Sequence, residues 1–132
     1  VENQIVFTGF VDSADLTAYF ALCDIYIMLS KVSSDGKVLE GFGISNIEAS
    51  AAGKPVIAGE IGGTQQSVLH GETGYRMNPN DMGQIALKIK ELLQDENKRM
   101  QLGERGKQFV KEHFQEKDLA RQFLDMCKQI VT

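Results

Sequence analysis

The 132-residue sequence is poor in the features that mark several classes of protein. Its two cysteines, Cys23 and Cys127, are too few for a disulfide framework or a metal cluster, so we expect buried thiols in a reducing compartment. No apolar run approaches the roughly 18 residues of a membrane span. The first residues have neither the basic start nor the long apolar stretch of a signal peptide, so we expect none. These absences predict a cytoplasmic protein, with a peripheral position at the inner face of the membrane as an alternative.

Positive charge is also scarce. Lys and Arg together number 14 against 18 Asp and Glu, which gives a net charge of -4. Nucleic-acid binding requires clustered basic residues that neutralise phosphates, and we therefore expect no nucleic-acid partner. Hydrophobic residues at 42% and charged residues at 24% are the proportions of a globular protein. The length suits one domain with a real hydrophobic core.

Short apolar runs alternate with helical patterns in the first half of the chain. Such alternation predicts a parallel sheet with crossover helices, that is, an α/β protein with a Rossmann-like sheet of about four strands. The continuous run at 25–29 predicts a strand buried on both faces. Ser13 is expected to cap the first helix, Gly53 to end the second and Asp81 to cap the helical last third. The expected strands are 5–8, 25–29, 56–58 and 75–77, and the expected helices begin at 14, 44, 64 and 82.

One segment, 40–48, has the residue types of a ligand site. Glu40 and Glu48 lie eight residues apart, and Gly41 and Gly43 form an elbow between them before a predicted helix. Glycines let the backbone approach a ligand without a Cβ clash. The N–H groups of 42–46 then lie at a helix N-terminus, which suits an anion such as a diphosphate.

The two glutamates extend this interpretation to a sugar nucleotide. Glu48 can accept two hydrogen bonds from a vicinal diol such as a ribose, and Glu40 can reach a sugar hydroxyl beyond the phosphates. Ligands of parallel sheets bind at the carboxyl ends of strands, where this loop is expected. Two plainer interpretations stay open: a glutamate near a helix start can simply stabilise the dipole, and a glycine elbow can be only a tight turn. The segment is neither a phosphate-binding P-loop nor a completed Gly-x-Gly-x-x-Gly fingerprint.

The segment 40–48 resembles the Glu-x7-Glu motif of retaining glycosyltransferases with the GT-B fold, family 4 (glycosyl transferases group 1). The resemblance continues through Ala-Ser-Ala-Ala-Gly-Lys-Pro-Val-Ile at 49–57, which is similar to the family's Glu-Ala-x-Ala-x-Gly-x-Pro-Val. It extends to the Gly-Gly pair at 62–63, the Gly-x-x-Gly at 71–74 and the turn at 78–81. It covers nearly the whole chain, from Val1 to about Phe114.

The resemblance implies the C-terminal, donor-binding half of such an enzyme, in incomplete form. Residues 1–114 would be a partial nucleotide-sugar-binding domain, and 115–132 would be a C-terminal helix. Glu40 would be the catalytic residue, bonded to a hydroxyl of the donor sugar. Glu48 would hold the ribose, and the Ile44 N–H would meet a phosphate. The backbone of Phe42 and Gly43 would contact the same donor sugar, and the backbone around Phe10 and Val11 would border the nucleobase. The implied donor-binding residues are Phe10, Val11, Gly41, Phe42, Gly43, Ile44 and Glu48.

The sequence departs from the family pattern in two ways. Gln66 stands where many relatives have a glutamate. The length is about one third of a complete enzyme of this family, so we expect the acceptor domain, and the Arg and Lys that usually brace the diphosphate, to be absent from this sequence. Lys31 and Lys37 lie nearby but are expected to be solvated loop charges. We therefore expect the isolated chain to be inactive.

The implied parent activity moves a hexosyl group from a UDP- or GDP-linked sugar to an acceptor hydroxyl with retention, in polysaccharide, glycolipid or capsule synthesis. No cofactor or metal is expected. The partners would be the nucleotide-sugar donor and an acceptor sugar or lipid-linked glycan bound by the missing N-terminal domain. Oligomer formation through exposed sheet edges is a further alternative. The alternatives are a non-catalytic nucleotide-binding or assembly module and a nucleotide-sugar epimerase, which would need a proton-transfer pair near the sugar.

Overall fold

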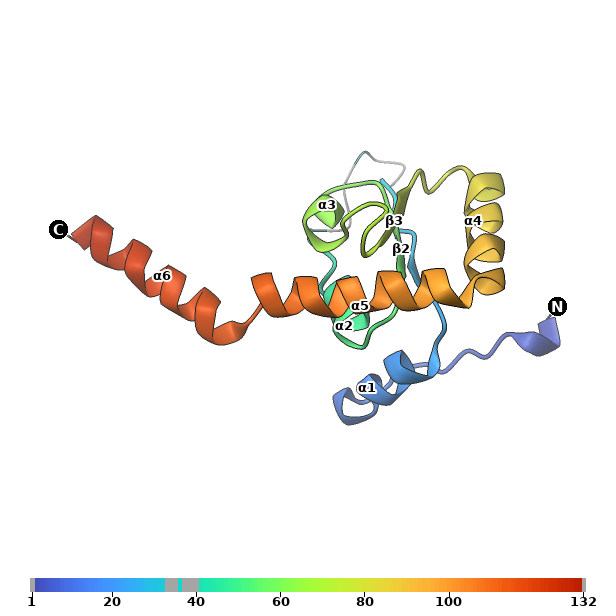
Figure 1. Cartoon of the computed structure of the whole chain (residues 1–132), viewed down its shortest axis with the longest axis horizontal. Helices are drawn as coiled ribbons and strands as arrows, with labels where there is room; N and C mark the ends of the chain where they lie inside the picture. Colours follow the sequence, from blue (N-terminus) through green and yellow to red (C-terminus); the bar gives the residue numbers. More distant parts are fainter. Residues whose placement is uncertain (1, 33–35, 37–40, 132) are drawn as a thin grey trace.

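A computed structural model describes residues 2–32, 36 and 41–131 of the chain. Its three strands form one parallel sheet in the order β1-β2-β3, with helices packed around it (Figure 1). The predicted α/β class is confirmed. The elements in chain order are η1 (Glu2–Gln4), α1 (Ser13–Leu22), β1 (Tyr26–Met28), α2 (Ile44–Ala51), β2 (Val56–Gly59), α3 (Thr64–Ser67), β3 (Gly74–Met77), α4 (Met82–Gln94), α5 (Glu96–His113) and α6 (Glu116–Val131).

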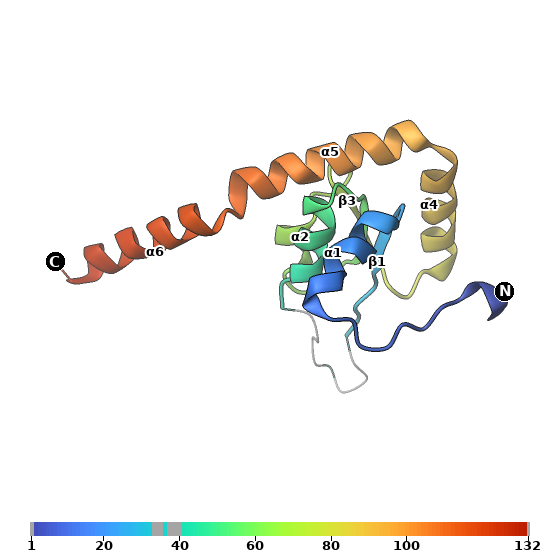
Figure 2. The same cartoon turned by 90° about the horizontal axis from the view of Figure 1, so that it is seen from below.

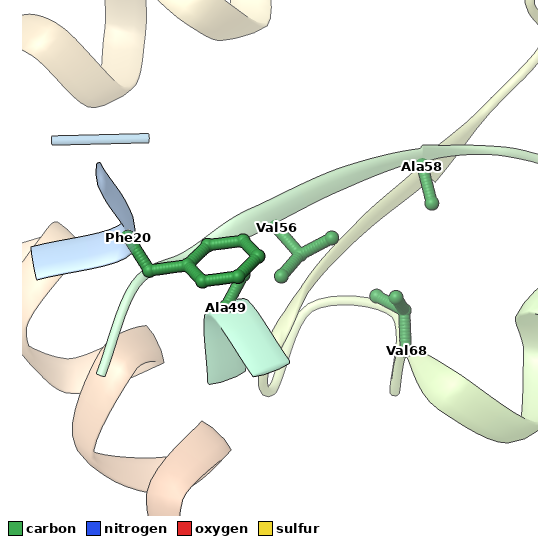
Figure 3. Packing of buried hydrophobic residues seen from close by; sticks show 5 residues of the cluster. All are labelled: Phe20, Ala49, Val56, Ala58 and Val68. Atoms are coloured by element: carbon green, nitrogen blue, oxygen red, sulfur yellow. The ribbon is translucent and has the colours of Figure 1, made fainter. Parts of the chain in front are cut away.

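The core lies on both sides of the central strand β2, whose four residues are all buried. Successive strand residues face opposite sides of a sheet. Val56 and Ala58 accordingly pack with side chains of α1 and α2 (Figure 3), whereas Ile57 faces the side chains of α4 and α5. The first cluster consists of Phe20, Ala49, Val56, Ala58 and Val68, and the second of Ile57, Leu92 and Leu102.

Helix α5 packs closely against α2 because two glycines lie at their contact. A Cβ on Gly103 would overlap the carbonyl oxygen of Gly53, and a Cβ on Gly106 would lie 3.3 Å from the Cβ of Ser50. Both glycines are buried. This close approach fixes α2, the helix that follows the glycine elbow, against the longest helix of the chain.

Two of the three predicted helix ends are confirmed. Gly53 has the left-handed φ of 75° that ends α2, and the Asp81 carboxylate accepts a hydrogen bond from the Gln84 N–H at 3.0 Å at the start of α4. The prediction for α1 was one residue late. Asp12 occupies the N-cap position, and Ser13 is the first helical residue. Ser13 and Asp12 are both good cap residues, so local propensity alone did not separate them.

The predicted strand at 5–8 is wrong. These residues have no regular secondary structure, and Val6 and Phe7 are 83% and 93% exposed. A strand exists only where its backbone N–H and C=O groups find a partner strand. The three-stranded sheet of the described residues does not include this segment, so its β-branched and aromatic composition had no ladder to join.

The strand predicted at 25–29 forms as β1 but is not buried on both faces. Ile27 is 40% exposed, and its neighbours in β1 are half-buried. Among the described residues β1 pairs with β2 alone. An edge strand has helices over less of its surface than a central one, which explains the partial exposure.

Helix α6 projects away from the rest of the molecule, and the two termini lie at opposite ends in both views (Figures 1 and 2). Its exposed apolar residues include Leu119, Phe123, Met126 and Ile130, whose 4-3-4 spacing places them along one helix face. The accessible surface of 9333 Å² exceeds the roughly 6,900 Å² that area scaling gives for a compact monomer of 14.6 kDa. The projecting helix and the exposed 5–10 segment account for this extended shape.

Both cysteines are free thiols and are half-buried rather than fully buried. Burial raises the pKa of the Cys23 thiol, and the nearby Lys54 ammonium offsets part of that rise. None of the helices in the described part of the chain is both long enough and apolar enough to cross a bilayer.

Candidate functional site

The glycine elbow stands directly before α2, at the carboxyl end of β1. Gly43 occupies the N-cap position of α2 with a left-handed φ of 82°. A Cβ at this residue would overlap the side-chain nitrogen of Asn46 and would lie 3.1 Å from the Met28 Cε. Both the backbone conformation and the lack of space therefore require glycine at position 43.

A second glycine turn lies against the elbow. The Gly63 N–H donates a hydrogen bond to the Gly41 carbonyl at 3.0 Å, and a Cβ on Gly63 would overlap that same oxygen. Gly59, the last residue of β2, similarly has no room for a Cβ because the Ser30 carbonyl adjoins it. The loops that follow β1 and β2 thus meet at the carboxyl edge of the sheet, where the sequence places the candidate site.

The N-terminus of α2 is open. Within the described residues no side chain caps it, and the Asn46 N–H bonds back to the Gly43 carbonyl at 2.9 Å. Ile44, the first helical residue, is 70% exposed. Unsatisfied N–H groups and the helix dipole make such an end attractive to an anion. The predicted phosphate position at Ile44 is consistent with this geometry and stays a prediction.

Glu48 lies one helical turn further along and faces a pocket between α1 and α2. The pocket has a volume of about 380 Å³ and combines an apolar wall with hydroxyl groups and one carboxylate. Such a lining suits a ligand with a flat apolar part and a diol. The lining residues are Ser13, Leu16, Thr17, Phe20, Glu48, Ala51 and Ala52.

The predicted nucleobase residues do not line this pocket. Phe10 is 91% exposed and Val11 is half-buried, and both lie in the chain just before α1. Ser13 and Thr17 of α1 line the pocket instead. Sequence reasoning missed these two hydroxyl residues, although their i, i+4 spacing on one helix face was a signal that could have found them.

Two of the predicted residues lie outside the described part of the chain. They are Glu40, the expected catalytic residue, and Lys37. Lys31 is exposed, as expected for a solvated loop charge, and Gln66 is exposed on α3. The structure thus places Gly41 and Gly43 at the N-terminal end of α2 and Glu48 one turn into the same helix.

Hydrogen bonds from two polar side chains attach the start of α2, next to the elbow, to neighbouring elements. The Ser45 hydroxyl donates to the Met28 sulfur at 3.2 Å, and the Asn46 amide donates to the Ser67 hydroxyl at 3.1 Å. Asn46 and Ser67 are fully buried. These contacts attach the first turn of α2 to β1 on one side and to α3 on the other.

A smaller hollow of about 210 Å³ lies beside the glycine turn at 59–63. Glu60, Gly62 and Arg76 are among the residues that line it. Within residues 2–32, 36 and 41–131 no three His, Cys, Asp or Glu side chains are grouped so as to hold a metal ion. The described site offers a ligand helix N–H groups, a carboxylate and hydroxyls.

A family model described as "Glycosyl transferases group 1" matches residues 1–109. The chain belongs to this glycosyltransferase family. It is 34% identical over 128 residues to a GDP-mannose-dependent alpha-(1-6)-phosphatidylinositol monomannoside mannosyltransferase of Mycobacterium tuberculosis, a match that covers 97% of this chain and 33% of the relative.

Solved structures of GT-B glycosyltransferases share the fold over almost the whole chain. Sucrose-phosphate synthase from Thermosynechococcus elongatus superposes with a TM-score of 0.84 at 29% identity, covering 98% of this chain and 31% of its own. Anabaena HepE in complex with UDP superposes with a TM-score of 0.85 at 26% identity, covering 97% and 33%. The chain thus spans about a third of the length of these proteins, and the predicted relation to GT-B glycosyltransferases is confirmed.

Proposed function

We propose that this chain is the donor-binding part of a retaining glycosyltransferase that takes a hexosyl group from a nucleoside diphosphate sugar. The observation that carries the proposal is the placement of Glu48 on a pocket one turn from the open N-terminus of α2. The rise from Ile44 to Glu48 is about 6 Å. That separation lets one helix hold a diphosphate at its end and the neighbouring ribose at its side.

Each part of the site has a role in this proposal. The N–H groups at the start of α2 hold the diphosphate, and Glu48 accepts hydrogen bonds from the ribose hydroxyls. The apolar wall of α1 receives the nucleobase, next to the predicted Phe10 and Val11. The elbow backbone from Gly41 to Gly43 lies against the sugar, and Glu40 bonds to one of its hydroxyls. HepE, which shares this fold, has been solved in complex with UDP, and this supports a nucleotide ligand for a protein of this fold.

The proposed reaction needs positioning and electrostatics more than acid–base chemistry. As the sugar–phosphate bond breaks with oxocarbenium character, negative charge grows on the departing diphosphate. A helix N-terminus already aimed at that group stabilises the charge where it develops. Holding the donor in one geometry lowers the barrier further. The chain supplies no catalytic base in this scheme, and no cofactor or metal is required.

The rest of the proposal concerns the parent protein. The acceptor, a sugar or lipid-linked glycan in polysaccharide, glycolipid or capsule synthesis, would bind to a domain that this sequence does not contain. The chain alone would therefore be inactive. A position at the inner face of the cytoplasmic membrane and oligomer formation through open sheet edges belong to the same proposal.

Calorimetric titration with UDP and GDP tests the donor site. We expect one of them to bind the chain and Glu48→Ala to bind it at least about tenfold more weakly, because hydrogen bonds to a charged carboxylate are lost. Glu104→Ala is the matched control, since Glu104 is an exposed glutamate of α5 outside the pocket. Equal binding by Glu48→Ala, or no binding by the unaltered chain, would contradict a donor site here.

A further inference from the structure

We propose that Asn46 is a positioning residue for the diphosphate, which it serves by fastening the glycine elbow to α3. This inference rests on the proposed function, because it assigns a role within the same site. Asn46 is fully buried and cannot touch a ligand itself. It acts through Gly43, whose conformation aims the first N–H groups of α2.

The fastening consists of a buried hydrogen bond between two helices. The Asn46 amide donates to the Ser67 hydroxyl at 3.1 Å, and the Ser67 hydroxyl donates to the Thr64 carbonyl at 3.3 Å. All three residues are buried. The first turn of α2 is therefore tied through Ser67 to the backbone of α3.

The same side chain supports the elbow residue. The Asn46 amide fills the space that a Cβ on Gly43 would need, while the Asn46 N–H bonds to the Gly43 carbonyl. Gly43 is thus held from inside the fold in its left-handed conformation. If this contact is lost, Gly43 has other conformations open to it, and the N–H groups that follow it turn with it.

A second bond secures the same junction from the other side. The Gly63 N–H donates to the Gly41 carbonyl, and Gly63 directly precedes α3. The elbow and the α3 segment are therefore joined at two points, one through Gly41 and one through Asn46. Two attachments on either side of Gly43 restrict the only left-handed residue of the elbow.

The polar character of Asn46 itself points to a positioning role. Among the described residues its Oδ1 has no hydrogen-bond partner, although the residue is fully buried. A buried acceptor without a partner costs stability, and an apolar side chain of similar size would avoid that cost. An amide at this position donates a hydrogen bond to Ser67, which a leucine side chain cannot do.

Hydrogen–deuterium exchange of the segment 41–48 tests the fastening without any ligand. In Asn46→Ala and in Ser67→Ala we expect these amides to exchange roughly five- to tenfold faster, the change that one buried hydrogen bond gives. The double variant should exchange no faster than the more affected single variant, because both changes remove the same bond. The exchange rates of the β2 amides should not change. If Asn46→Ala does not fold, Ser67→Ala tests the hydrogen bond by itself.

Ser50→Ala is the matched control. Ser50 is also a fully buried polar residue of α2, but within the described structure its hydroxyl has no hydrogen-bond partner. Removing it breaks no such bond, so exchange at 41–48 should stay at the wild-type rate. If Asn46→Ala and Ser67→Ala also leave that rate unchanged, the proposal is overturned whatever the nucleotide data.

Affinities for UDP and UMP, or for GDP and GMP, then test the link to the diphosphate. We expect the wild type to bind the diphosphate more tightly than the monophosphate. In Asn46→Ala the ratio of these two affinities should fall about tenfold, because diphosphate binding weakens while the monophosphate affinity stays unchanged. Faster exchange with an unchanged diphosphate preference would overturn the positioning role alone. A wild-type chain that binds UDP and GDP no better than UMP and GMP would overturn the proposed diphosphate site, and the role of Asn46 with it.

Discussion

The ring of Phe42 packs against the ring of Phe114, with centroids 5.7 Å apart and planes tilted by 58°. Phe114 follows the end of α5 and also meets Phe109 edge-on at 5.3 Å. The elbow residue whose backbone is proposed to contact the sugar thus has its side chain held by the end of α5. The elbow is therefore in contact with a residue about seventy positions further along the sequence.

This contact predicts that Phe114→Ala destabilises the protein. Phe114 is half-buried, so we expect a loss of roughly 2 kcal/mol, below the ~3–5 kcal/mol of a fully buried phenylalanine. Phe123→Ala is the control, because Phe123 is exposed on α6. Urea unfolding followed by circular dichroism measures both, and equal midpoints for the two variants would show that the Phe42–Phe114 contact adds no stability.

The close packing of α5 on α2 predicts opposite effects for two glycine substitutions. Gly103→Ala places a Cβ onto the backbone oxygen of Gly53, which cannot move aside easily, and should cost about 1–3 kcal/mol. Gly83→Ala in α4 meets only Asp81 Oδ1 at 3.6 Å, and should gain up to about 1 kcal/mol from helix propensity. Thermal unfolding of both variants gives the sign directly. A stabilising Gly103→Ala would disprove the close α2–α5 contact.

Helix α6 is predicted to be dispensable for folding of the rest of the chain. It supplies no residue to either buried cluster, and its described side chains are exposed apart from the half-buried Cys127. Removing residues 116–132, which leaves Phe114 in place, should change the free energy of unfolding by less than about 0.5 kcal/mol. A loss well above that value would mean that α6 packs on the body in solution.

The Cys23 thiol is predicted to react slowly with alkylating reagents near neutral pH. Burial raises its pKa, so the reactive thiolate is scarcer in the folded chain than in the unfolded one. In a Cys127→Ser variant the rate of reaction with iodoacetamide can be followed against pH, first folded and then in denaturant. The folded protein should need a higher pH to reach half its maximal rate. Coincident profiles would show that Cys23 is solvated.

Local patterns in the sequence determined much of this protein. Helix starts and stops followed from cap residues such as Asp81 and Gly53, whose preferences act within a few residues of the chain. The parallel α/β class followed from apolar runs alternating with helical patterns. The elbow between Gly41 and Gly43 and the place of Glu48 one turn into α2 were also readable, because they depend on spacing within one short segment.

Contacts between distant segments were decided only by the tertiary structure. The segment 5–8 has strand composition but joins no strand among the described residues, because a ladder requires a partner that composition does not supply. The α1 side chains Ser13 and Thr17 lie beside Glu48 only because α1 packs next to α2. Likewise the Asn46–Ser67 bond joins residues 21 positions apart. Such pairings depend on how the elements pack, and no local propensity encodes them.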